Sequence, residues 1–254
     1  MASADSQSTT IRYLPTKDAY DRWACVYDID GNFLQAMDDI EMRSLLPRFE
    51  ASVQTAGRPL KLVDLGCGTG RNTALLLGIQ DAEVVALDAS EGMLAVAERR
   101  LRDARGDIDD GARLTLGVFD LIAAEQPPEV AVSADGIIST LVLEHIPLET
   151  FFKHVSRTLK PGGVLLLTNM HAEMGQVSQA GFVDAATGEK IRPTSFAHTV
   201  GDVVKEAGRW GLVVLGRLEE RAVTEDLVDR LGPRSRKWVG ITCWFGGLFR
   251  KTAP

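Results

Sequence analysis

LKLVDLGCGTG, residues 60–70, is the stretch of this sequence that decides its fold. The apolar run Leu60–Leu65 leads directly into three glycines at alternate positions, and a good helix start, RNTALLL, follows at residues 71–77. Glycine has no Cβ, so the backbone can turn tightly there and a ligand can lie against it. The helix that follows offers free N–H groups and the positive end of its dipole. The pattern predicts a strand, a ligand-binding glycine turn and a helix.

This loop lacks the spacings that bind nucleotide phosphates. A dinucleotide fingerprint needs G-x-G-x-x-G, but its third glycine falls at Arg71 or at Thr73. A phosphate-cradling P-loop ends in Gly-Lys-Ser or Gly-Lys-Thr, which is absent from the loop. The pattern present is Asp-x-Gly-x-Gly-x-Gly, which begins at Asp64.

Apolar strands alternate with helices along most of the chain, which is typical of a parallel sheet covered on both faces. A turn, Pro-Gly-Gly at residues 161–163, precedes the most apolar strand. We expect strands at residues 60–65, 83–87, 114–118, 135–140, 164–168, 212–215 and 238–248.

The segments between and before these strands complete the expected organisation. Residues 1–57 form a helical cap, with 1–12 disordered and 18–56 helical, and residues 58–254 form the main domain. A hairpin insertion near 172–197 follows strand five. We expect one helix that begins after the N-cap Ser90 and three more at residues 71–77, 147–159 and 199–210. A charged loop is expected at residues 99–113.

Composition bounds the class of protein. The chain has 254 residues, of which 45% are hydrophobic and 25% charged, as expected of one α/β domain with a small extension. A net charge of −7 repels phosphate backbones, so we expect no nucleic-acid partner. The three cysteines have neither zinc-binding nor disulfide spacing, and the sequence shows no other metal-ligand pattern. It also shows no membrane-spanning run and no signal core. We therefore expect a cytoplasmic protein without a metal, monomeric or homodimeric.

The chain resembles the class I S-adenosylmethionine (SAM) dependent methyltransferases, small-molecule type. The resemblance rests on the glycine loop, on the acid Asp88 at the end of the second strand, and on FDL (119–121), LVLEHI (141–146) and LKPGG (159–163), in that order. It implies a seven-stranded, mostly parallel Rossmann-like sheet with helices on both faces. It also implies SAM as the cofactor and S-adenosylhomocysteine (SAH) as the product.

The resemblance implies roles for residues at the ends of several strands. Asp88 is expected to accept the ribose hydroxyls, and Asp120 the adenine amino group, while Thr140 and Leu141 line the methionine side. The full set of expected cofactor-binding residues is Tyr20, Trp23, Tyr27, Asp64, Gly66, Cys67, Gly68, Gly70, Asp88, Ala89, Met93, Phe119, Asp120, Leu121, Thr140, Leu141 and His145.

Three aromatic residues mark the N-terminal segment. Tyr20, Trp23 and Tyr27 have the spacing i, i+3 and i+7, which places them on one face of a helix. They form either packed core or a lid over cofactor and substrate, and the segment resembles the aromatic cap of small-molecule members of the family. We favour the lid.

Four residues are candidates for catalysis: Tyr20, His145, His171 and His198. An unperturbed imidazole can take a proton near neutral pH. A structural role, as a helix cap or a loop residue, is the alternative for each histidine. Methyl transfer to a good nucleophile can also proceed without a base, through alignment alone.

The sequence therefore predicts a SAM-dependent methyltransferase that moves a methyl group to an O, N or C nucleophile of a small molecule. The acidic charge, the aromatic cap and the insertion favour a small-molecule partner. Two alternatives stay open: a protein methyltransferase with an open groove, and a SAM-binding cyclase or binding protein that does not methylate, because fold does not fix function.

Overall fold

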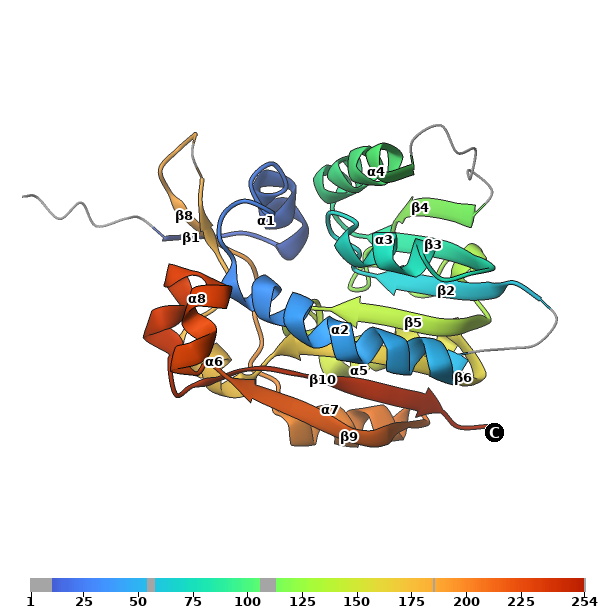
Figure 1. Cartoon of the computed structure of the whole chain (residues 1–254). Helices are drawn as coiled ribbons and strands as arrows, with labels where there is room; N and C mark the ends of the chain where they lie inside the picture. Colours follow the sequence, from blue (N-terminus) through green and yellow to red (C-terminus); the bar gives the residue numbers. More distant parts are fainter. Residues whose placement is uncertain (1–10, 54–57, 106–112, 185, 254) are drawn as a thin grey trace, which may run out of the picture.

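The computed structural model describes residues 11–53, 58–105, 113–184 and 186–253. It confirms the expected α/β architecture, with a seven-stranded sheet at the centre (Figure 1). The strand order is β4-β3-β2-β5-β6-β10-β9, and β10 alone runs antiparallel to its neighbours β6 and β9. The strands are β2 (Leu60–Leu65), β3 (Ala82–Asp88), β4 (Leu114–Val118), β5 (Ala134–Thr140), β6 (Leu159–Met170), β9 (Leu212–Ala222) and β10 (Thr242–Lys251).

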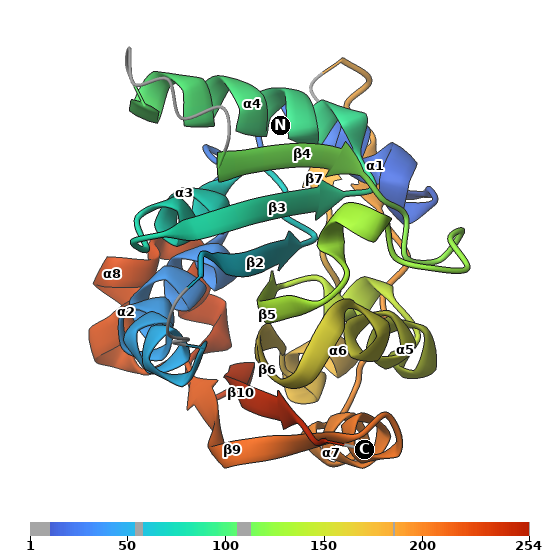
Figure 2. The same cartoon turned by 90° about the vertical axis from the view of Figure 1, so that its right-hand side faces the viewer.

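Helices cover both faces of this sheet because the buried strands are apolar on both sides. Leu62 of β2 packs into the core on one face, and its neighbour Val63 into the core on the other. The helices α2 (Phe33–Val53), α3 (Arg71–Leu77) and α4 (Glu91–Arg105) lie over the first face, and α5 (Leu148–Thr158) and α7 (Val200–Arg209) over the second (Figure 2). The short helices α6 (Ala172–Val177) and α8 (Val228–Leu231) lie toward the same end of the sheet as the N-terminal segment (Figure 1).

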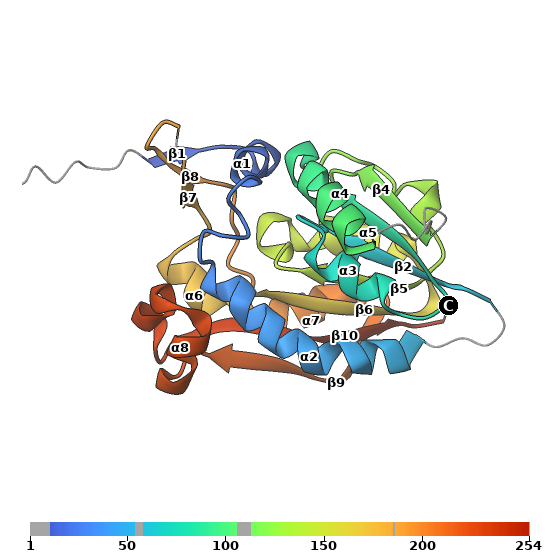
Figure 3. The ribbon, with the colours of Figure 1, turned by 45° about the horizontal axis from the view of Figure 1, so that its top comes forward.

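A small unit stands above the carboxyl ends of the parallel strands, and we call it the cap (Figure 3). It consists of α1 (Thr16–Trp23), the turn that follows it to residue 32, and a three-stranded sheet of β1 (Ile11–Tyr13), β8 (Lys190–Arg192) and β7 (Phe182–Val183). The hairpin β7–β8 confirms the hairpin expected near residues 172–197.

Aromatic packing joins the two halves of the cap. The Trp23 ring of α1 stacks on Phe182 of β7, with ring centroids 5.0 Å apart and an angle of 17° between the planes. The cap is also fixed to the main domain, because the Asp21 carboxylate accepts hydrogen bonds from the Ser90 hydroxyl (2.6 Å) and the Gly92 N–H (3.0 Å) at the start of α4.

Several expected boundaries were wrong. Residues 11 and 12, expected in a disordered lead, belong to β1, which pairs in parallel with β8; residues 1–10 lie outside the described ranges. The helical stretch expected over 18–56 is two helices, because the chain turns at Gly31, where φ is +73°. Tyr27 therefore lies in a turn and not on the helix of Tyr20 and Trp23.

The other corrections concern charged or aromatic segments. Helix α4 continues to Arg105 through part of the loop expected at 99–113, since its apolar stripe includes buried Leu101; residues 106–112 are not described. Residues 233–238 form a 3₁₀ helix (η5) that begins with Pro233, so the last strand starts at Thr242 and not at 238. Strand β9 is longer than expected, because its charged end pairs with β10. Strand β6 is also longer, because it begins at Leu159, which pairs with Ala134, and includes the turn expected at residues 161–163.

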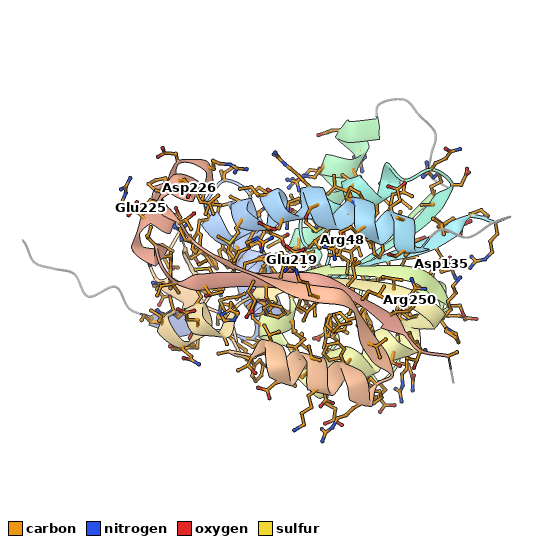
Figure 4. The ribbon with its side chains drawn as sticks, turned by 60° about the horizontal axis from the view of Figure 1, so that its bottom comes forward. Arg48, Asp135, Glu219, Glu225, Asp226 and Arg250 are labelled. Carbon is orange, nitrogen blue, oxygen red and sulfur yellow. The ribbon has the colours of Figure 1, made fainter. Side chains whose placement is uncertain are left out.

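Ion pairs join the strands of the main sheet to neighbouring segments (Figure 4). Arg48 of α2 forms an ion pair with Glu219 of β9 at 2.9 Å. The buried Asp135 near the start of β5 forms ion pairs with Arg58, at 2.5 Å, and with Lys160. Among the residues that the structure describes, no helix is long and apolar enough to cross a membrane.

Candidate functional site

The glycine loop leaves β2 and turns beneath the end of β3. The N–H groups of Gly66 and Cys67 both donate to the Leu87 carbonyl, at 2.8 and 2.9 Å. Gly66 has φ +77°, and a Cβ there would lie 2.3 Å from the Val142 side chain. At Gly68 (φ +53°), no atom lies within 4 Å of the place a Cβ would take. The loop thus packs tightly on one side and leaves space on the other.

Asp88 holds this loop from the end of β3. Its carboxylate accepts a hydrogen bond from the Gly68 N–H and another from the Ser90 N–H, each 2.8 Å long. Burial raises the pKa of the Asp88 carboxyl to about 6, although both hydrogen bonds lower it. The Asp88 side chain therefore connects the glycine loop to the start of α4.

A cavity of about 240 Å³ opens at the carboxyl ends of β2, β3, β4 and β5, where ligands bind in open α/β sheets. We call it the first cavity. The sequence-predicted residues that line it are Tyr20, Tyr27, Gly66, Gly68, Asp88, Ala89, Met93, Phe119, Asp120, Leu121, Thr140, Leu141 and His145.

Eight further lining residues escaped the sequence prediction. Some of them are chain neighbours of predicted residues, and this proximity in sequence could have identified them. The residues that precede Tyr20 have no such sequence signal. The eight are Pro15, Thr16, Lys17, Leu65, Ser90, Ile122, Val142 and Ile146. Among them, the buried Thr16 hydroxyl has no hydrogen-bond partner in the described part of the chain.

Four predicted cofactor-binding residues lie outside this wall. Asp64 accepts a 2.6 Å hydrogen bond from the Thr73 hydroxyl, and burial raises the pKa of its carboxyl to about 6. Cys67 is packed among Ala86 and Leu94, and a Cβ on Gly70 would meet Ala97 of α4. These three residues shape the loop from behind.

The fourth, Trp23, faces a second cavity of about 120 Å³. Its indole N–H donates to the Asp30 carboxylate at 2.8 Å. Tyr20, Tyr27 and Leu141 line both cavities, so the two spaces adjoin at these side chains. Leu141 has φ +56°, a strained conformation for a branched residue, at the end of β5.

The Tyr20 hydroxyl and the His145 ring form a buried pair between cap and main domain, with 2.8 Å between Oη and Nε2. The other nitrogen, Nδ1, lies 2.6 Å from the Thr194 carbonyl oxygen, which can only accept. Nδ1 therefore carries the proton, and Nε2 accepts from the Tyr20 hydroxyl. Burial lowers the pKa of His145 to about 4 and raises that of Tyr20 well above its ordinary value, so both side chains are neutral.

Glu144, next to His145, lines the second cavity from its buried side. Its backbone is fixed, because its N–H donates to the Asn169 side chain and its carbonyl accepts from the Phe196 N–H. Its Oε2 atom has no hydrogen-bond partner in the described part of the chain. Burial raises the pKa of this carboxyl to about 7.

The two other candidate histidines line neither cavity. His171 is the N-cap of α6, where Nδ1 accepts from the Glu173 N–H, and its Nε2 contacts Glu220 at 3.0 Å. His198 contacts the Ile146 carbonyl through Nε2 at 2.9 Å, and its pKa is lowered by burial. Both have structural partners, so we do not propose either as catalytic. In the described residues, no group of three or more His, Cys, Asp or Glu side chains is placed to hold a metal ion.

Comparisons with known proteins agree with this geometry. Residues 63–165 match the family model described as a methyltransferase domain. An uncharacterized methyltransferase of Emericella nidulans is 50% identical over 95% of this chain and 93% of its own length. A trans-aconitate 2-methyltransferase of Methylobacterium radiotolerans is 30% identical over 69% of each chain.

A solved structure shows the same fold over nearly the whole length. The DhpI–SAH complex has a TM-score of 0.63 at 19% identity, and the match covers 94% of this chain and 96% of that one. From these matches and the motifs, the chain belongs to the class I SAM-dependent methyltransferases, and it is a methyltransferase enzyme.

Proposed function

We propose that this methyltransferase binds SAM in the first cavity and transfers its methyl group to a small molecule held in the second. The observation that carries the proposal is the junction of the two cavities at Tyr20, Tyr27 and Leu141. A donor in one space and an acceptor in the other then meet at one point. In this family, SAM supplies a methyl group made electrophilic by the positive sulfur.

The side chains present fit such a cofactor. The open space above Gly68 admits a ligand against the backbone, and the unpaired Thr16 hydroxyl needs a partner. We assign the ribose hydroxyls to the Asp88 carboxylate, whose oxygens retain free lone pairs beside the two N–H groups. The apolar walls, among them Met93 and Phe119, suit an aromatic base.

The remaining lining residues receive roles by their position. Asp120 already accepts from the Ile122 and Ala123 N–H groups, which hold its carboxylate at the rim where an adenine amino group would donate. Thr140, whose hydroxyl accepts from Asn72 at 2.6 Å, and Leu141 line the side toward the second cavity. The methionine portion of the cofactor is assigned to this side.

Tyr20 is proposed to position the acceptor. Because its hydroxyl proton is directed to His145, the lone pairs of its oxygen are left to face the junction. The Tyr20 oxygen of this neutral pair can therefore accept a hydrogen bond from the small molecule that receives the methyl group, and neither side chain needs to ionise. The cap above the strand ends would exclude water from the reacting atoms.

The same cap favours a small molecule over a protein substrate. A protein methyltransferase needs an open groove for a peptide, whereas Pro15, Thr16 and Lys17 of the cap form a wall of the first cavity. The named relative acts on trans-aconitate, a small molecule. We retain the cytoplasm as the expected compartment and a monomer or homodimer as the expected state.

Calorimetric titration of the purified protein with SAM and with SAH tests the proposal. We expect micromolar binding of both, weakened at least tenfold by Asp88→Ala, since each charge-assisted hydrogen bond lost costs about 1.5–3 kcal/mol. Asp103→Ala, an exposed acid on α4, is the control and should leave the affinity unchanged. A folded wild-type protein that binds neither compound would refute the proposal.

A further inference from the structure

The second cavity carries positive charges that the protein itself leaves without partners. Lys190 of β8 and Lys237 of η5 line it from segments far apart in the sequence. Within the described part of the chain, no carboxylate lies within 4.0 Å of either ammonium group; Lys237 only lies over the Trp238 ring, at 5.0 Å. In a chain of net charge −7, two unpaired cations at one cavity favour an anionic ligand.

A third cation lies beside them. Arg234 of η5 also lines the cavity, and its guanidinium donates to the Asp30 carbonyl at 2.5 Å. Its nearest carboxylate oxygen, Asp30 Oδ1, lies 3.9 Å away, beyond hydrogen-bond distance. The cationic side of the cavity is thus formed by the hairpin and η5 together.

The same cavity contains two carboxyl oxygens without hydrogen bonds. Glu144 Oε2 and Asp30 Oδ1 are both buried and unpartnered in the described residues. The Glu144 side chain is only 4% exposed, so water does not readily satisfy it. A buried polar atom of this kind calls for a partner, and a carboxyl oxygen is satisfied by a hydroxyl or amino group.

We propose that the second cavity recognises a small organic acid that also carries a hydroxyl or amino group. Its anionic group lies between Lys190 and Lys237, and its hydroxyl or amino group donates to Glu144 Oε2. This inference rests on the proposed function, because it names the class of methyl acceptor for the site that adjoins the first cavity. The two features together set the specificity. The lysines favour anionic over neutral ligands, and Glu144 favours acids that carry a hydrogen-bond donor over acids that lack one.

Ligand-detected NMR and calorimetry on the SAH-saturated protein test this inference. The probes are a library of small hydroxy acids, amino acids, simple acids, sugars and alcohols that includes the matched set malate, succinate and malamide. Succinate lacks the hydroxyl of malate, and malamide lacks its charge. We expect the ligands to be hydroxy or amino acids, with simple acids and neutral compounds at least tenfold weaker.

Variants separate the two features. The double change Lys190→Ala and Lys237→Ala should weaken the bound acids at least tenfold, whereas Lys153→Ala with Lys205→Ala, on helices of the other sheet face, should not. Glu144→Gln should reduce the difference in affinity between a hydroxy acid and its matched simple acid. Each variant must retain SAH binding, which shows that it is folded.

The outcomes are distinct. If SAH binds but the library yields only neutral ligands, or none, the inference is overturned while the proposed function stands. Binding of acids that is indifferent to both lysines also overturns it. If SAH itself does not bind, the proposed function fails and the inference falls with it.

Discussion

The two cavities adjoin, yet the chain builds them in different ways. The first is formed mostly by the ends of strands β2, β3 and β5 and by the loops directly after these strands and after β4. The second is formed by the cap, by η5 and by main-domain residues such as Glu144 and Met170, which meet only in space. The comparison teaches that the first cavity, the proposed cofactor site, depends on backbone geometry repeated along the chain, whereas the second, the proposed acceptor site, depends on long-range packing.

The largest expected effect breaks the backbone side of this comparison. Gly66→Ala should lower the free energy of unfolding by about 2–4 kcal/mol, since it combines a positive φ with a clash against Val142. Gly162→Ala is the matched control, because φ is +78° there but the space is open, and it should cost about 1 kcal/mol. Urea unfolding measures both, and equal losses would show that the contact with Val142 has no importance.

A smaller effect, in pH, sharpens the role of Asp88. Its carboxyl has a pKa of about 6, so it is mostly ionised above pH 7 and mostly protonated below pH 6. Under the proposed assignment, only the ionised form accepts both ribose hydroxyls. We expect the affinity for SAH to be constant from pH 8 to 7 and to fall about tenfold by pH 5. Calorimetry on Asp88→Asn should give weak binding with no such fall; a wild-type affinity that is flat to pH 5 would contradict the assignment.

The smallest effect tests the joint between cap and main domain. Tyr20→Phe removes the hydrogen bond to His145 and leaves a buried ring nitrogen unpaired, which should cost about 1 kcal/mol of stability. Tyr27→Phe is the control, since the Tyr27 hydroxyl makes no hydrogen bond within the described ranges, and it should change stability by less than about 0.5 kcal/mol. Thermal unfolding of both variants measures the difference, and equal stability would mean that the pair does not hold the cap.

Most of the residues that the sequence places at the cofactor line the first cavity, because their signals are local. Gly66, Asp88 and Phe119 each follow a recognisable apolar strand, and parallel strands bring their ends to one edge. The seven strands were expected for the same reason. Their boundaries shifted, at the start of β6, which includes the turn expected at residues 161–163, at the 3₁₀ helix 233–238 and along β9.

The second cavity was not predicted because no local pattern carries it. Lys190 and Lys237 look like ordinary surface lysines until the hairpin and η5 are placed on the cap. Trp23 was expected to contact cofactor, but its stack on Phe182, a residue far along the chain, turns it to the other side. His171 and His198 were reasonable candidates by position, and tertiary contacts gave each a structural partner.

The pairing of β1 with β8 has a consequence for how the protein is made. Ile11 pairs with Lys190, so the contact with the greatest span in the cap joins the first described residues to a hairpin synthesised much later. Contacts of such sequence separation form slowly, because a long loop must close first. On the ribosome, the glycine loop and its neighbouring strands emerge before the hairpin does. In the nascent chain, the strand ends that line the first cavity therefore form well before the cap covers them, and the second cavity is completed last.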